Sequence, residues 1–193
     1  MNVLVIMGGP RKRANTETAL NAFLKGVEEG TDFTYRVVDV CKIKVNPCIG
    51  CLQCASSGSC IYRDDMKTLY RDFEWANAII VASPLYFNSV TAQLKAVIDR
   101  CEVYFSRKFA LNKPIRDHKI PGVFICVGGV DQPDEEFVGA TKVIDLFFKG
   151  ISAETSRVEI VAGTDKVSVM DSPETQARLR SAGESFSSRL KGV

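Results

Sequence analysis

The stretch VLVIMGGPRKRANT, residues 3–16, decides the fold. Its first five residues, Val3 to Met7, form an apolar run of the kind found in strands that are buried on both faces of a parallel sheet. Two glycines follow, and Asn15 or Thr16 then supplies a start signal for a helix. A buried strand that turns through glycines into a helix predicts the first β-α unit of an α/β fold.

The rest of the chain repeats this alternation. Further strands are predicted at residues 33–38, 78–82, 122–127 and 157–161, and helices at residues 16–28, 66–73, 91–104, 135–149 and 173–191. Five β-α units favour a three-layer, doubly wound α/β sheet with five parallel strands in the flavodoxin-like order 2-1-3-4-5. We expect one domain over residues 1–193, with a cysteine-rich loop at residues 41–63. Residues 105–119 also show neither helical nor strand periodicity, and loops of this length are usually functional or form oligomer contacts.

Composition narrows the class of protein. Lys and Arg total 25 against 23 Asp and Glu, so the net charge of +2 predicts neither nucleic acid nor a membrane surface as a partner. No apolar run reaches the roughly 20 residues of a membrane span, and the first residues do not resemble a secretory signal. We therefore expect a cytoplasmic protein. In that compartment its seven cysteines are more typical of metal ligands or redox thiols than of disulfides.

The glycine turn after the first strand can form an anion site. Backbone N–H groups and the positive end of the helix dipole converge there. Gly9 permits close backbone approach, Arg11 adds a permanent charge with paired donors, and Asn15 and Thr16 can donate side-chain hydrogen bonds. The turn matches neither G-x-G-x-x-G nor G-x-x-x-x-G-K-[ST], which argues against an NAD-binding or P-loop site. A solvated basic turn is the alternative interpretation.

Several motifs resemble one family. GGPRKRANT at residues 8–16 resembles the G-S-P-R-x-x-G-N-T phosphate loop of the NAD(P)H-dependent FMN reductase family. ASPLYFNSV at residues 82–90 resembles its S/T-P-x-Y-x-x-S flavin loop, AQLKAVIDR at 92–100 its L-K-x-x-I-D-R helix, and VGG at 127–129 its third flavin loop. Gly9 replaces the usual Ser, which removes one hydroxyl from the phosphate loop, and Ala14 replaces a frequent Gly.

The resemblance implies an FMN site at the carboxyl ends of the strands, where open α/β sheets bind ligands. It places the phosphate on one loop and the flavin ring on two others, and it requires no catalytic side chain because the flavin carries the chemistry. The implied binding residues are Gly9, Pro10, Arg11, Asn15, Thr16, Pro84, Leu85, Tyr86, Phe87, Asn88, Val127, Gly128 and Gly129.

Four cysteines within thirteen positions, Cys48, Cys51, Cys54 and Cys60, give the spacing C-x2-C-x2-C-x5-C. A compact C-x2-C-x2-C run with a fourth ligand is typical of a cubane iron-sulfur cluster. Zinc sites more often use two separated C-x2-C pairs, and free or redox-active thiols are a further alternative. The spacing resembles that of the iron-sulfur flavoproteins, relatives of the FMN reductases, and this resemblance implies a [4Fe-4S] cluster near FMN.

These observations predict an iron-sulfur flavoprotein that passes electrons through a [4Fe-4S] cluster and FMN to a small acceptor. Ferredoxin or NAD(P)H would be the donor. The alternatives are an NAD(P)H-dependent FMN or quinone reductase without a cluster, and a flavin electron carrier without enzymatic turnover. The aromatic and basic residues at 105–119 favour a homo-dimer or tetramer. The other cysteines, Cys41, Cys101 and Cys126, are expected as small buried hydrophobic residues.

Overall fold

The computed structural model describes residues 1–30, 32–131 and 133–190. Within them, one sheet of five parallel strands has the order β2-β1-β3-β4-β5. The strands are β1 (Asn2–Met7), β2 (Thr34–Asp39), β3 (Ala78–Pro84), β4 (Ile120–Val127) and β5 (Ala153–Val161). The predicted fold class and strand order are confirmed, and the order reverses between β1 and β3.

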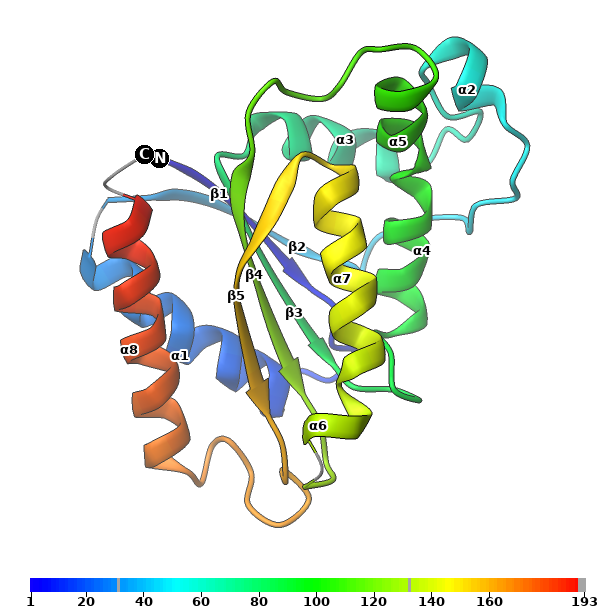
Figure 1. Cartoon of the computed structure of the whole chain (residues 1–193). Coiled ribbons are helices and arrows are strands. Elements are labelled where there is room, and N and C mark those ends of the chain that lie inside the picture. The colour runs from blue at the N-terminus through cyan, green and yellow to red at the C-terminus, as the bar shows by residue number, and fades with distance from the viewer. Residues whose placement is uncertain (31, 132, 191–193) are drawn as a thin grey trace.

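Helices cover both faces of the sheet (Figure 1). One face carries α1 (Asn15–Gly30) and α8 (Pro173–Leu190), and the other carries α3 (Met66–Trp75), α4 (Ala92–Arg100), α5 (Glu102–Phe109) and α7 (Val138–Gly150). The short helices α2 (Gln53–Ser57) and α6 (Pro133–Glu136) lie in connections. No helix in the described part of the chain is both long and apolar enough to cross a membrane.

Two hydrophobic cores result from this sandwich. Successive side chains of a strand point to opposite faces, so Val3 and Val5 of β1 pack under α1 and α8, whereas Leu4 and Ile6 pack under the other helices. All four side chains are buried. Each such side chain contributes roughly 1.5–3 kcal/mol when removed from water. The strands are therefore fixed firmly, and the loops at their carboxyl ends start from fixed positions.

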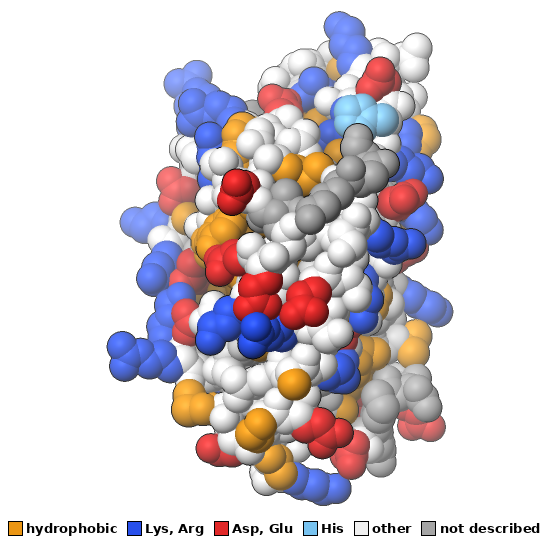
Figure 2. All heavy atoms as spheres, turned by 90° about the vertical axis from the view of Figure 1, so that its left-hand side faces the viewer, with side chains coloured by type: hydrophobic (Ala, Val, Ile, Leu, Met, Phe, Trp, Pro, Cys, Tyr) orange, Lys and Arg blue, Asp and Glu red, His pale blue; other side chains and the backbone are white. Residues whose placement is uncertain are grey.

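Helices α1 and α8 touch through their backbones. A Cβ atom on Gly26 would lie 1.9 Å from the carbonyl oxygen of Arg180, so only glycine permits this approach. On the outer side of the pair, the guanidinium of Arg180 contacts the carboxylate of Glu29 at 2.5 Å. Figure 2 shows this face of the molecule, on which basic and acidic side chains are interspersed.

Two predicted helices are divided. The helix predicted at residues 91–104 breaks at Cys101, where ψ near 0° and a hydrogen bond from its N–H to the carbonyl of Ile98 (3.0 Å) tighten the turn. The chain then continues as α5 to Phe109, so the prediction of irregular structure from residue 105 is wrong over residues 105–109. The helix predicted at 135–149 divides at Phe137.

Candidate functional site

Three predicted flavin segments lie together at one edge of the sheet, beside the point where the strand order reverses. The loop after β1 is joined to β3 because the N–H of Gly8 donates to the carbonyl of Ala82 at 2.7 Å. The loop after β3 is joined to β4 because the N–H of Leu85 donates to the carbonyl of Val127 at 2.8 Å. The structure thus brings residues 8–16, 84–88 and 127–129 to the same edge; their contact with a flavin stays a prediction.

The loop after β1 is tightly packed. Gly8 and Gly9 are buried, and the carbonyl of Gly8 accepts a hydrogen bond from the hydroxyl of Thr91 at 2.8 Å. A Cβ atom on Gly9 would lie 2.8 Å from Cε of Met7 and 3.3 Å from Cβ of Thr16. Met7 Cε is the end of a flexible side chain and can shift, so the packing is tight here without requiring glycine. The first N–H groups of α1, which follows this turn, have no acceptor within the helix.

The basic residues of this loop have different surroundings. Lys12 Nζ lies 2.5 Å from the Asp39 carboxylate at the end of β2. Burial alone would raise the pKa of Asp39, but the hydrogen bond from Lys12 lowers it below its ordinary value. Arg11 is exposed and makes no ion pair or hydrogen bond with any described residue. Lys12 therefore anchors the loop, whereas Arg11 is available to bind an anion.

The segment after β5 closes one side of this edge, and the sequence analysis gave it no role. The N–H and hydroxyl of Thr164 donate to the carbonyl of Gly128 at 3.1 and 3.0 Å, and the N–H of Asp165 donates to the carbonyl of Gly129 at 3.1 Å. The Asn15 side-chain oxygen accepts from the N–H of Val169 at 2.9 Å. The Gly-Thr-Asp turn signal at residues 163–165 could have indicated a structured loop here.

A strained turn projects from the loop after β3. Tyr86 and Ser89 exchange backbone hydrogen bonds of 2.9 and 3.0 Å. Between them, Phe87 and Asn88 have φ values of 48° and 57°, in the left-handed region that non-glycine residues rarely adopt. The ring of Phe87 is fully exposed, and Tyr86 is 40% exposed. Strain of about 1–3 kcal/mol per residue clusters at functional sites, and this turn exposes two aromatic rings at the carboxyl end of β3.

The four clustered cysteines line one pocket, whose lining also includes the apolar side chains of Ile49, Leu52, Ile61 and Val103. All four thiols are free; Cys48 and Cys51 are exposed, and Cys54 and Cys60 are half-buried. Cys54 Sγ lies 3.5 Å from the hydroxyl of Ser106 on α5. In Figure 1, α2 and this loop lie beside α5 at the top of the view, whereas the carboxyl ends of β3, β4 and β5 lie at the bottom.

The shared pocket does not form a site for one ion. In residues 1–30, 32–131 and 133–190, no group of three or more Cys, His, Asp or Glu side chains lies close enough to hold a single metal ion. The ligands of zinc all lie about 2.0–2.3 Å from one centre. A cubane instead holds four thiolates apart, one at each iron. The described structure thus shows four free thiols around a common pocket and no assembled metal site.

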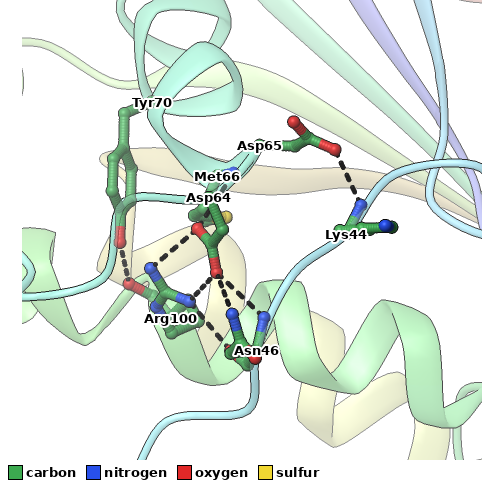
Figure 3. A network of polar contacts seen from close by, with 7 residues as sticks. All are labelled: Lys44, Asn46, Asp64, Asp65, Met66, Tyr70 and Arg100. Atoms are coloured by element: carbon green, nitrogen blue, oxygen red, sulfur yellow. Dashed lines mark hydrogen bonds and ion pairs between the residues drawn. The ribbon is translucent and has the colours of Figure 1, made fainter.

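The cysteine loop is clamped at its neck by a buried ion pair (Figure 3). Arg100 at the end of α4 donates through Nη1 and Nη2 to the two oxygens of Asp64 at 2.7 and 3.1 Å. Nη1 also donates to the carbonyl of Asn46 at 2.8 Å, and the N–H of Asn46 donates to Asp64 at 2.9 Å. Arg100 is 1% exposed and Asp64 is 7% exposed. The two ends of the loop, at Asn46 and Asp64, are thus tied to one arginine.

Charge stabilises this clamp. Burial alone would raise the pKa of Asp64, but the hydrogen bonds from Arg100 and Asn46 lower it to about 2. Burial alone would lower the pKa of Arg100, but the hydrogen bond to Asp64 and the Coulombic attraction of Tyr70 and Cys60 raise it above its ordinary value. Arg100 lies in a segment that a sequence motif singled out, but its pairing with Asp64 was not predicted.

The remaining cysteines fall into two groups. Cys101 and Cys126 are buried, as predicted, and burial raises the pKa of the Cys126 thiol to about 12. The prediction is wrong for Cys41, which is only partly buried because it lies in the loop after β2, with its sulfur 3.9 Å from the carbonyl oxygen of Gly8. Neither Cys101 nor Cys126 lines the pocket of the four clustered cysteines.

Comparison with protein families gives one match. The family described as NADPH-dependent FMN reductase matches residues 1–144. Among curated relatives, an iron-sulfur flavoprotein of Archaeoglobus fulgidus is 38% identical over 135 residues, which are 70% of this chain and 58% of that protein. An iron-sulfur flavoprotein of Methanocaldococcus jannaschii is 33% identical over 150 residues, which are 77% of this chain and 71% of that protein. The chain thus matches 58% of the length of the first relative.

Solved structures show the same fold. An FMN-dependent NADH-azoreductase from Bacillus anthracis, in complex with FMN, superimposes with a TM-score of 0.74 at 16% identity and covers 98% of both chains. An NAD(P)H:quinone oxidoreductase from Methanothermobacter marburgensis gives a TM-score of 0.70 at 20% identity and covers 96% of both chains. At these identities the likeness shows the fold alone.

Proposed function

The chain belongs to the NADPH-dependent FMN reductase family, and we propose that it is a flavin-dependent oxidoreductase that passes electrons through a [4Fe-4S] cluster and FMN to a small acceptor. Residues 1–193 would act as one FMN-binding domain that carries the cysteine loop. The observation that carries the proposal is a pair of features in one chain: the predicted phosphate and flavin segments meet at the carboxyl ends of the strands, and four free cysteines line a common pocket.

The first site supplies the groups that FMN requires. Arg11 would hold the phosphate by charge-assisted hydrogen bonds together with the N–H groups at the start of α1. Gly9 leaves room for that contact, and Tyr86 and Phe87 would contact the ring. The remaining predicted contacts are Pro10, Asn15, Thr16, Pro84, Leu85, Asn88, Val127, Gly128 and Gly129. Bound FMN takes up a hydride as an electron pair or transfers electrons singly.

The second site would hold the cluster through Cys48, Cys51, Cys54 and Cys60. The cluster supplies one-electron transfer. The names of the relatives support this proposal, since both are iron-sulfur flavoproteins. Ferredoxin or NAD(P)H would be the donor. The four cysteine side chains would hold the cluster, and the clamp of Arg100 would keep the loop around it in place.

A homo-dimer or tetramer would bring the two sites together. Within one chain, the cysteine loop lies away from the carboxyl ends of β3, β4 and β5 (Figure 1). Helices α5 and α7 expose Phe105, Phe109 and Leu146, and the first two rings lie 4.6 Å apart. Such a surface fits a second copy of the chain. Light scattering after size exclusion should give at least a dimer at micromolar concentration, and a monomer would contradict this part of the proposal.

The test is the cofactor content of protein that is purified without oxygen. We expect about four irons and four acid-labile sulfides per FMN, with loss of iron in Cys51→Ser. The matched control is Cys126→Ala, which removes a thiol buried in β4 and should retain iron. FMN without iron would instead favour an NAD(P)H-dependent FMN or quinone reductase or a flavin electron carrier. Absence of FMN would overturn the proposal.

A further inference from the structure

Arg100 has one buried N–H group that takes no part in its hydrogen bonds to Asp64 and Asn46. Both terminal nitrogens of the guanidinium are hydrogen-bonded to Asp64 and Asn46. Its Nε atom is buried and has no hydrogen-bond partner among the described residues. Buried donors in proteins are almost always paired, and those of a charged group are costly to leave unpaired. The unpaired Nε–H group therefore indicates that a hydrogen-bond acceptor is missing beside Arg100.

The same arginine lies at the proposed cluster site. Arg100 lines the pocket together with Cys48, Cys51, Cys54 and Cys60. Cys60, the last of these cysteines, and Arg100 therefore face the same cavity.

The ring of Tyr62 does not satisfy the free N–H of Arg100. Cζ of Arg100 lies over the face of this ring, 4.8 Å from its centroid, and this cation–π contact supplies no acceptor atom for a hydrogen bond. The N–H of Nε lies in the guanidinium plane, and a partner for it must therefore lie beside the guanidinium rather than over its face. The cysteine pocket, which Arg100 lines, offers sulfur atoms as acceptors when the cluster is bound.

We propose that the Nε–H group of Arg100 donates a hydrogen bond to a sulfur atom of the bound cluster on the side of Cys60, and that this bond raises the midpoint potential of the cluster. The inference rests on the proposed function, because it requires the cluster. Arg100 is thus both the clamp of the loop and a positioning residue that tunes the cluster.

The direction of the effect follows from charge. A reduced cluster carries one more negative charge than an oxidised cluster, so its sulfur atoms accept hydrogen bonds more strongly. A donor in a buried pocket therefore stabilises the reduced state more than the oxidised state. Hydrogen bonds to the sulfur atoms, net charge and solvent exposure are the terms by which proteins set these potentials. Loss of the bond should lower the potential.

The test is a redox titration of the cluster in the intact holoprotein, followed by electron paramagnetic resonance. Arg100→Lys keeps the positive charge opposite Asp64 but removes the Nε–H group. We expect the equilibrium constant for reduction to fall about tenfold, which is about 59 mV for one electron. The control is Arg107→Lys. Arg107 contacts Glu74 at 3.1 Å and does not line the cysteine pocket, so this variant should keep the wild-type potential.

A second measurement needs no variant and covers the case in which Arg100→Lys does not fold. Pulsed electron paramagnetic resonance of the reduced wild-type protein labelled with 15N at arginine Nε should show a 15N coupling in place of the 14N coupling of the unlabelled protein. A wild-type potential in Arg100→Lys, or no coupling in the labelled protein, overturns the inference and leaves the proposed function intact if four irons are present. Protein without iron overturns both.

Discussion

The predicted flavin loops, at residues 8–16, 84–88 and 127–129, and the cysteine loop, at residues 41–63, are held by different contacts. The flavin loops continue buried strands, and backbone hydrogen bonds such as Leu85 N–H to Val127 carbonyl, 2.8 Å, join each loop to its neighbour. The cysteine loop has one short helix, α2, with no buried residue, and its neck depends on Arg100 and Asp64. The difference shows that backbone hydrogen bonds between strands and loops fix the first region, whereas the second is fixed mainly by side chains around one buried ion pair. A single substitution should therefore loosen the second region alone.

The largest effect is expected at that ion pair. In Asp64→Ala, the buried guanidinium of Arg100 loses its counter-charge, and the free energy of unfolding should fall by about 3–5 kcal/mol. Urea denaturation measures the loss, and hydrogen exchange should increase first at residues 44–64. Asp99→Ala is the control because it removes the exposed pair with Lys95 on the same helix, which contributes under about 0.5 kcal/mol. Equal losses in the two variants would contradict the comparison.

Acid should act on the same region with a smaller effect. The pKa of Asp64 is about 2 in the folded chain against an ordinary value of 3.8, so the ionised carboxylate favours the folded state above pH 3.8. The stabilisation, about 2 kcal/mol, is lost as the pH falls from about 4 towards 2. Unfolding of wild type and Asp64→Asn at several pH values measures it. The two stabilities should converge near pH 2, and a constant difference would contradict the assignment.

In the predicted flavin region, Arg11→Gln should weaken the binding of FMN and leave the free energy of unfolding nearly unchanged. Arg11→Gln removes an exposed guanidinium without a described partner, so the free energy of unfolding should change by less than about 0.5 kcal/mol. The dissociation constant of FMN should rise about tenfold because a charge-assisted phosphate contact is lost. Fluorescence titration of the apoprotein measures this constant. Riboflavin, which lacks the phosphate, is the control ligand and should bind both proteins equally.

The smallest effect is expected at the strained turn. Phe87→Gly relieves the strain of a φ of 48° but adds backbone freedom to the unfolded chain. These two effects oppose each other, so the free energy of unfolding should change by less than about 1 kcal/mol. Flavin binding should weaken modestly because the exposed ring is lost. Thermal unfolding and FMN titration measure the two quantities. Leu85→Gly offers a contrast because this residue packs against the core, and its loss should cost more stability than that of Phe87.

The fold could be predicted from local patterns because each strand of a parallel sheet is an apolar run and each run is followed by a helix. Even so, the break at Cys101 was not predicted, since both sides of it carry helical periodicity and the tight turn depends on tertiary packing. The order of the strands followed from the connection rules. It did not require knowledge of any side-chain contact.

The sites were predicted less completely. The glycines and cysteines could be singled out as candidate site residues because their spacing in the sequence is itself the signal. The pairing of Arg100 with Asp64 was missed because 36 residues separate them and each lies in a motif with a local explanation. The segment after β5 was missed for the same reason, since its contacts with Gly128 and Gly129 arise only when β4 and β5 are adjacent.

The central claim is that one chain carries two separate cofactor sites, and a crossed measurement of iron and FMN tests it most directly. Both cofactors are quantified in wild type, Cys51→Ser and Arg11→Gln, each purified without oxygen and dialysed against the same buffer. The account predicts that Cys51→Ser loses iron and keeps FMN, whereas Arg11→Gln retains less FMN than wild type and keeps iron. Loss of both cofactors in either variant, or wild-type protein without iron, would contradict it.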